Sequence, residues 1–195
     1  MSPSTKALRL ARLQAYYRQK FHATKYKQVK DSTRRHWSCN RAIFNAIMRA
    51  CLTCGVSIDC NACSLADGSN SLLPDYCSPA DSFLRGAHKY LGYWVNPPFH
   101  RAQQFIQAAV RHAKQNANVM MILPDWPDRP WFKHAQMHFT KVHTFNAGTM
   151  LFDRLNIGPS SAHRYCAPSP WPVSIYANCN AANELQLSEQ LQRTF

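Results

Sequence analysis

The fold is decided by residues 92–99, which read Gly92-Tyr93-Trp94-Val95-Asn96-Pro97-Pro98-Phe99. The first four residues predict a buried strand, and the Asn-Pro-Pro that follows ends it abruptly. Apolar residues then recur at helical spacing from Arg101 to Lys114, which predicts a helix. Residues 119–123 form a continuous apolar run, as is typical of a central parallel strand. This alternation predicts an open, Rossmann-like α/β sheet with helices on both faces.

Other elements extend this pattern on both sides. Apolar spacing predicts a helix running to about Thr53, ended by Gly55 and followed by a short buried strand over residues 56–58. We predict a long loop over 63–80, a short helix near 82–90, a rigid loop over 124–131, strands at 141–145, 150–152 and 173–176 that we expect to be antiparallel, and a terminal helix at 183–192. The chain therefore divides into an N-terminal segment over 1–36, an α/β domain over 37–182 and a C-terminal helix over 183–195.

The composition indicates a basic protein with one core. The chain has 195 residues with 23 Lys and Arg against 10 Asp and Glu, a net charge of +13 and a pI near 9.7. A protein this basic usually binds a polyanion, most often nucleic acid. No apolar run approaches the roughly 20 residues of a membrane span, so a transmembrane protein is excluded.

Most of this charge lies in residues 1–36, which hold ten Lys and Arg but a single acid, Asp31. Apolar spacing predicts an amphipathic helix over about 4–30 within this basic arm. Two other interpretations are open: a solvated helix that keeps the protein soluble, or an organelle-targeting peptide. No secretory signal is expected, because no apolar run follows the first cations. We favour phosphate contact by Arg9, Arg12, Arg18, Lys20, Lys25, Lys27, Lys30, Arg34 and Arg35.

The segment Asn96-Pro97-Pro98-Phe99 follows a strand and precedes a helix, where open α/β sheets bind their ligands. These residue types suit methyl transfer to an exocyclic amine. The Asn96 oxygen and a backbone carbonyl can accept both amine hydrogens, which returns the nitrogen lone pair for attack. The two prolines stiffen the turn, and the aromatic ring can stack on a base swung out of its strand. The other interpretation is an ordinary turn.

The order of features from Trp37 to Phe132 resembles the phage-type DNA adenine-N6 methyltransferases and related domains in retrotransposon polyproteins. A helix containing Ile43-Phe44 leads to Ile58-Asp59-Cys60-Asn61-Ala62, similar to the family's strand ending in Asp-x-x-Ala. The family's order then continues through Asn70, Tyr76-Cys77-Ser78, Asp81, Trp94-Val95-Asn96-Pro97-Pro98-Phe99, Ile122-Leu123-Pro124 and Trp131-Phe132.

This resemblance implies a methyltransferase sheet and S-adenosylmethionine as cofactor. It implies that Asp59, Ala62 and Asp81 bind the cofactor, and that Asn96, Pro97, Pro98 and Phe99 carry the chemistry. We expect Asp59, Asp81 and Asn96 to line one cleft with Phe99 at its mouth, unless the two carboxylates are loop caps. Trp126, Trp131 and Phe132 are expected to wall a base pocket or to fill the core.

The cysteines raise the question of zinc. Cys51-x-x-Cys54 and Cys60-x-x-Cys63 are two pairs of the kind that binds zinc. Only five residues separate the pairs, fewer than in most structural zinc sites, so buried free thiols are the favoured interpretation. His134 and His138 are assigned to a helix surface or to phosphate contact.

Three functions are consistent with these observations. The first is an S-adenosylmethionine-dependent adenine-N6 methyltransferase that acts on DNA, or on RNA. The alternative is a non-catalytic nucleic-acid-binding scaffold of a ribonucleoprotein assembly, such as a mitochondrial ribosome, with other proteins as partners. No Gly-rich cofactor loop is evident after Asp59, which keeps this alternative open, and a zinc-stabilised interaction module is a third. Any of these is expected inside the cell, with nucleus, cytoplasm and mitochondrion not distinguished.

Overall fold

A computed structural model describes residues 37–64, 68, 70–79, 82–86, 90–155 and 164–195. The basic arm over 1–36, with its predicted helix and phosphate contacts, lies outside these residues, and so does Asp81. In the described part of the chain no helix is long and apolar enough to cross a membrane.

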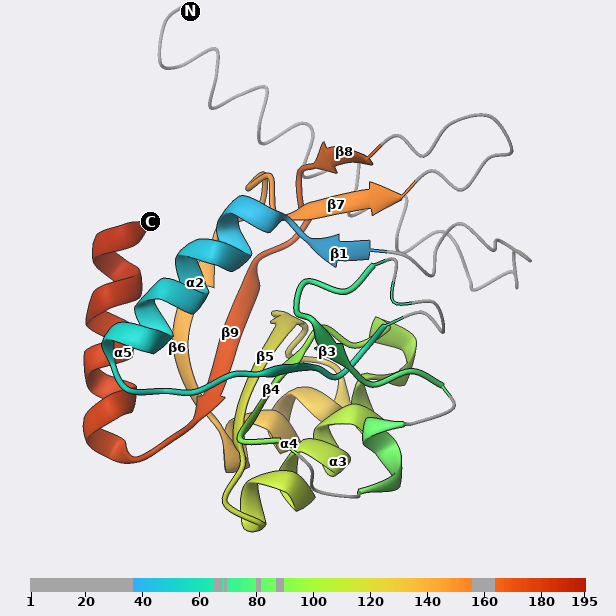
Figure 1. Cartoon of the computed structure of the whole chain (residues 1–195). Helices are drawn as coiled ribbons and strands as arrows, with labels where there is room; N and C mark the ends of the chain where they lie inside the picture. Colours follow the sequence, from blue (N-terminus) through green and yellow to red (C-terminus); the bar gives the residue numbers. More distant parts are fainter. Residues whose placement is uncertain (1–36, 65–67, 69, 80–81, 87–89, 156–163) are drawn as a thin grey trace, which may run out of the picture.

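The main sheet is mixed and has six strands in the order β3, β2, β4, β5, β9, β6 (Figure 1). The first four strands are parallel, and β9 runs antiparallel to both β5 and β6. Every residue of β4 is buried, and so is every residue of β5 after the first, because helices cover both faces. The strands span Cys60–Asn61 (β2), Asp75–Tyr76 (β3), Gly92–Val95 (β4), Asn118–Pro124 (β5), Thr140–Phe145 (β6) and Val173–Asn178 (β9).

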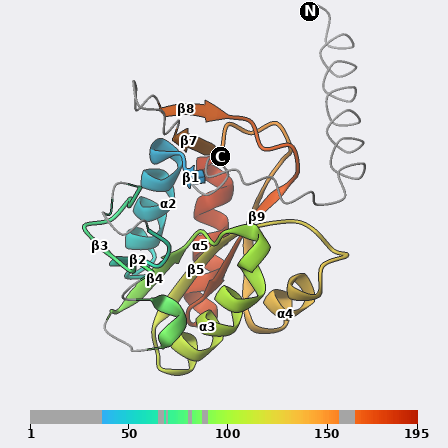
Figure 2. The same ribbon diagram turned by 90° about the vertical axis from the view of Figure 1, so that its right-hand side faces the viewer.

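The sheet is covered by four α-helices, two on each face, in the described part of the chain (Figures 1 and 2). Helices α2 (Arg41–Thr53) and α5 (Ala181–Thr194) pack on one face, and α3 (Ala102–Lys114) and α4 (Pro130–His138) on the other. Alternation along β5 supplies both cores, since Met120 and Ile122 face α2 and α5, whereas Val119, Met121 and Leu123 face α3 and α4. The predicted α/β class is confirmed.

A second, antiparallel sheet has three strands, with β7 (Phe152–Leu155) between β1 (Trp37–Cys39) and β8 (Arg164–Ala167). It lies beyond the end of the main sheet where β9 begins (Figure 1). Phe152 is fully buried at the start of β7, and the Asn40 amide donates to the Leu151 carbonyl at 2.8 Å. This small sheet is therefore joined to the main core next to the start of α2.

The prediction of the first strand was wrong in position. Gly55 has a φ of +68° and ends α2, with the Gly55 amide bonded to Leu52 O and the Val56 amide to Cys51 O. This pair of bonds is a Schellman cap, so the Val56 amide is used by the helix and cannot join a ladder. The strand begins at Cys60 instead of Val56, although the Val56 side chain is buried.

Several predicted elements are confirmed within a few residues, namely α2, β4, α3, β5, β6, β9 and α5. The segment predicted as a loop up to Trp131 instead starts α4 at Pro130, a residue suited to the first helical position. His134 and His138 lie in this helix. Strands β1, β3 and β8 were missed, the strand predicted at 150–152 begins at Phe152, and residues 83–85 form the 3₁₀ turn η2 (Phe83–Arg85) instead of an α-helix.

His143 makes stability depend on pH. Its ring lies 4.6 Å from the Phe145 ring and 5.4 Å from the Phe195 ring, and burial lowers the pKa of His143 below its usual value of 6.5. Between the lowered and the usual pKa the unfolded chain binds more protons, so the free energy of unfolding falls as pH drops through 6.5. We expect His143→Gln to weaken this dependence in urea unfolding at pH 7.5 and 5.5. Identical pH dependence in the two proteins would contradict the prediction.

Candidate active site

The strand order places a switch point between β2 and β4. The chain passes from β2 to β3 on one side and then returns to β4 on the other side of β2. Open α/β sheets bind ligands at such a point, outside the carboxyl ends of the strands. Ala62 marks the end of β2, with its amide bonded to Trp94 O at 2.8 Å, and Asn96 follows β4. We call this edge of the main sheet the carboxyl edge.

Asn96-Pro97-Pro98-Phe99 forms a rigid turn at the carboxyl edge. Pro97 is buried, Pro98 has a φ of −56°, and its carbonyl accepts the Arg101 amide at 2.7 Å. This closes the single 3₁₀ turn η3 (Phe99–Arg101), which continues directly into α3. Because both prolines fix their φ angles, the Asn96 side chain projects from a backbone with little freedom.

Cys63 contacts this turn from the end of β2. Burial raises the pKa of the Cys63 thiol well above its usual value, while a hydrogen bond from the Asn96 backbone amide and the charge of Arg101 oppose the rise in part. The thiol is therefore neutral at neutral pH and accepts a hydrogen bond from the backbone of Asn96. Sequence reasoning treated Cys63 as a zinc candidate and missed this contact, because only the strand pairing brings the two residues together.

An aromatic cluster surrounds the Phe99 ring. The ring meets the rings of Trp126, Phe152 and Trp171 edge to face, at centroid distances of 5.7, 6.0 and 6.3 Å. Trp126 and Trp171 also meet at 5.0 Å. Phe99, Trp126 and Trp171 are each partly exposed. Aromatic side chains of this kind are the groups on which nucleic-acid bases stack.

Of the two interpretations offered for Trp126, Trp131 and Phe132, core filling is confirmed for Trp131 and Phe132. Trp126 belongs to the aromatic cluster, whereas Trp131 and Phe132 are buried in the core beneath α4. Phe152 and Trp171 were not predicted. Their strands and loops lie far along the chain, and no periodicity in the sequence signals that they return to Phe99.

The predicted juxtaposition of Asp59 and Asn96 is wrong. The Asp59 carboxylate accepts the amides of Leu91 at 3.2 Å and Gly92 at 2.9 Å, so it lies beside the first residue of β4. Asn96 lies four residues further along, roughly 13 Å away at the rise of a strand. The reason is the late start of β2, because Asp59 precedes this strand instead of ending it. Asp59 is a loop cap.

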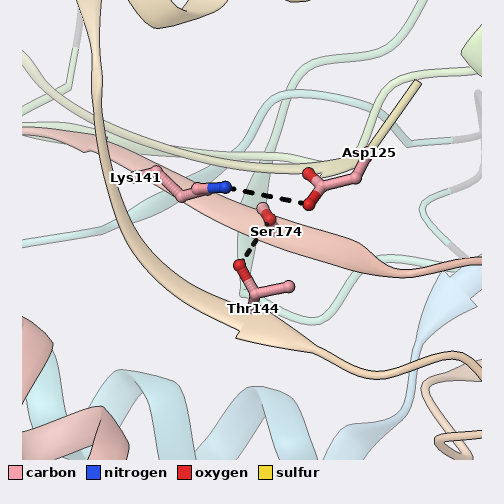
Figure 3. Close-up of polar contacts among 4 residues, drawn as sticks. All are labelled: Asp125, Lys141, Thr144 and Ser174. Carbon is pink, nitrogen blue, oxygen red and sulfur yellow. Dashed lines mark hydrogen bonds and ion pairs between the residues drawn. The ribbon is translucent and has the colours of Figure 1, made fainter. Parts of the chain in front are cut away.

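Asp125 also follows a parallel strand, and its side chain is directed toward β6. Figure 3 shows it directed across β9 toward Lys141 of β6, whose Nζ is 3.8 Å from Asp125 Oδ2. Next to it, the Thr144 and Ser174 hydroxyl groups are 2.8 Å apart on paired residues of β6 and β9. These contacts tie β6 to the end of β5.

The two CxxC pairs do not converge. Cys51 and Cys54 belong to the core under α2 and α5, and Cys51 Sγ lies 3.6 Å from Met120 Sδ. Cys60 lies in the core on the other face, with its sulfur 3.7 Å from that of Cys77. Burial, followed by the neighbouring Cys54 and Cys179, raises the pKa of Cys51 to about 12. Among the described residues no group of three or more His, Cys, Asp or Glu side chains could hold a metal ion.

Residues 26–164 match the family model of the DNA N-6-adenine-methyltransferases (Dam). The chain belongs to this family. The match covers more than two thirds of the sequence and includes the Asn96–Phe99 turn, Cys63 and Trp126, whereas Trp171, β9 and α5 lie beyond it. No curated protein matches the chain. The resemblance inferred from the order of motifs is confirmed, and family membership relates this protein to DNA adenine methylation.

Proposed function

We propose that this chain is an S-adenosylmethionine-dependent methyltransferase that modifies the N6 amine of adenine in DNA. The observation that supports it best is the rigid Asn96–Phe99 turn at the carboxyl edge, beside the switch point of the sheet. Four parallel strands with this crossover also support a Rossmann-like sheet. The basic arm over residues 1–36 is proposed to add phosphate contacts.

Each residue of the turn has a role in this proposal. The Asn96 side-chain oxygen and the Pro97 carbonyl accept the two hydrogens of the target amine, which makes the nitrogen a better nucleophile. The prolines hold these acceptors in place before the base arrives, so little reorganisation is needed. The Phe99 ring stacks on the flipped base. The extra proton on the methylated nitrogen leaves to water, so no strong base is required.

The cofactor fits the end of β2 but not Asp59. S-adenosylmethionine, when bound, would supply an electrophilic methyl group, with its sulfur keeping the electron pair of the broken S–CH3 bond and leaving as a neutral thioether. Ser64 Oγ is buried at the end of β2 without a hydrogen-bond partner in the described part of the chain, and such an atom suits a polar ligand. The small Ala62 precedes it at the carboxyl edge. We therefore propose Ala62 and Ser64 as cofactor contacts, while Asp59 is occupied at the other end of β4.

Incorporation of labelled methyl groups tests this function. The full chain is incubated with labelled S-adenosylmethionine and unmethylated duplex DNA, and the nucleosides are separated afterwards. We expect label in N6-methyladenine, and calorimetry is expected to show cofactor binding without DNA. DNA binding without cofactor binding or methylation would overturn the proposed methyltransferase function and favour the scaffold alternative.

Cys63 is expected to position Asn96. Because its thiol accepts the Asn96 amide, Cys63→Ala frees this part of the turn, and we expect kcat to fall by about 3–10-fold, as the loss of one hydrogen bond worth about 1 kcal/mol predicts. Cys63→Ser keeps an acceptor and is expected to retain more of the rate. The measurement is kcat and KM for DNA in both variants. Equal kcat values for Cys63→Ala, Cys63→Ser and the unsubstituted protein would exclude this role.

A further inference from the structure

Arg129 is placed beside the aromatic cluster. Its guanidinium carbon lies 5.7 Å from the centre of the Trp126 ring, and that ring meets Phe99 edge to face at the same centroid distance. Trp126 therefore contacts both the proposed base-stacking ring and an exposed cation. Proteins bind single nucleic-acid strands with aromatic rings on which the bases stack and with cations beside those rings. A flipped nucleotide is locally single-stranded, so the same arrangement suits it.

The backbone around Arg129 is fixed. The Arg129 amide donates to Trp126 O at 3.0 Å, which closes a turn over residues 126–129, and the Arg129 carbonyl accepts the Phe132 amide at 3.0 Å at the start of α4. The backbone of Arg129 is thus fixed by a short turn, and its guanidinium lies against the face of the Trp126 ring. A planar, weakly hydrated cation held in this way loses little entropy when it binds a second group.

The donors of Arg129 are also uncommitted among the described residues. Two other exposed arginines use theirs within the protein: Arg101 donates to the Gln104 side chain at 3.0 Å, and Arg111 to Leu84 O at 2.9 Å. In the part of the chain that the structure describes, Arg129 has no carboxylate within ion-pair distance and donates no side-chain hydrogen bond. A guanidinium carries five N–H donors and pairs with phosphate through two parallel bonds.

We propose that Arg129 binds a backbone phosphate of the DNA strand next to the flipped adenine, with Trp126 orienting its guanidinium. This rests on the proposed function and adds to it a residue that positions the substrate. Arg129 is a strand-holding residue and not a catalytic one, because the proposal gives it a contact with the phosphate backbone and none with the reacting atoms. Its loss weakens DNA binding for every sequence alike.

The test measures DNA affinity against salt concentration for Arg129→Ala, Arg129→Lys and Arg193→Ala. Arg193 is an exposed arginine of α5, on the opposite face of the sheet, and serves as the charge-matched control. We expect Arg129→Ala to reduce the slope of log affinity against log salt by about 0.9, the contribution of one duplex phosphate, and to raise KM for DNA several-fold. Arg129→Lys is expected to keep the slope but bind more weakly, and Arg193→Ala to match the unsubstituted protein.

Arg129→Ala with an unchanged slope, or the same change in slope for Arg193→Ala, would overturn the proposal. Thermal melting of each variant shows whether a loss of affinity reflects unfolding, and the lysine variant, which keeps the charge, tests the contact if the alanine variant does not fold. The slope is measured by equilibrium binding and needs no methyl transfer. Failure of the proposed enzyme function, seen as absent methylation by the unsubstituted protein, is therefore distinguished from failure of the Arg129 contact.

Discussion

Asn96→Ala is expected to lower kcat for adenine methylation by about 10²–10³-fold, the usual cost of removing one preorganised polar group from a reaction centre. The substitution removes the side-chain oxygen that we propose accepts an amine hydrogen. It leaves the backbone amide that donates to Cys63, and it leaves both prolines of the turn. We therefore expect KM for DNA and cofactor affinity to change far less than kcat.

Asn96→Asp provides the matched control, because it keeps an oxygen acceptor at the same distance from the backbone. We expect its kcat to lie between those of the alanine variant and the unsubstituted protein. The measurements are labelled-methyl incorporation, calorimetry with S-adenosylmethionine and thermal melting. A kcat for Asn96→Ala within threefold of the unsubstituted protein would remove Asn96 from the chemistry.

The elements around Asn96 could be predicted because each signal there is local. An apolar strand, a proline pair and a helix with one apolar face follow one another within residues 92–114, and all three are present as β4, the Asn96–Phe99 turn and α3. The run at 119–123 was recognised as a central strand because burial on both faces requires continuous apolar residues. Family membership followed from the order of such motifs.

The position of β2 could not be predicted, because it depends on how α2 ends. The Schellman cap at Gly55 uses the Val56 amide, so the strand begins further along the chain, at Cys60. The apolar pattern of the sequence does not reveal that the helix cap and the strand compete for this amide. Because β2 begins at Cys60, Asp59 lies beside the amino end of β4 and outside the proposed cofactor site.

Long-range contacts are the other part of the site that the sequence did not reveal. Phe152 and Trp171 reach Phe99 from segments more than 50 residues away, and Arg129 gains its place through Trp126. Phe152 belongs to the three-stranded sheet, which pairs residues near 37 with residues near 154. Such pairings are set by the tertiary fold and have no periodic signal within one segment.

Gly92→Ala is expected to lower the free energy of unfolding by about 3–4 kcal/mol, a large share of the 5–15 kcal/mol typical of a domain. A Cβ at Gly92 would lie 2.0 Å from the Ser57 carbonyl oxygen and 3.0 Å from its carbon. These are backbone atoms, so no side chain can rotate to make room. The segment before β2 has to move away from β4, which also breaks the two bonds between Gly92 and Asp59.

Gly55→Ala is the control that separates the cost of steric overlap from the cost of an unfavourable backbone conformation. Gly55 has a left-handed φ of +68°, but nothing lies within 4 Å of a Cβ there, so we expect a cost of about 1–2 kcal/mol from conformation alone. Gly92 is not in that conformation, and its cost comes from the close approach of Ser57. Urea unfolding of both variants measures the difference. If Gly92→Ala were no less stable than Gly55→Ala, the residues before β2 would not pack against β4 as described, and the explanation for the position of Asp59 would be lost with that contact.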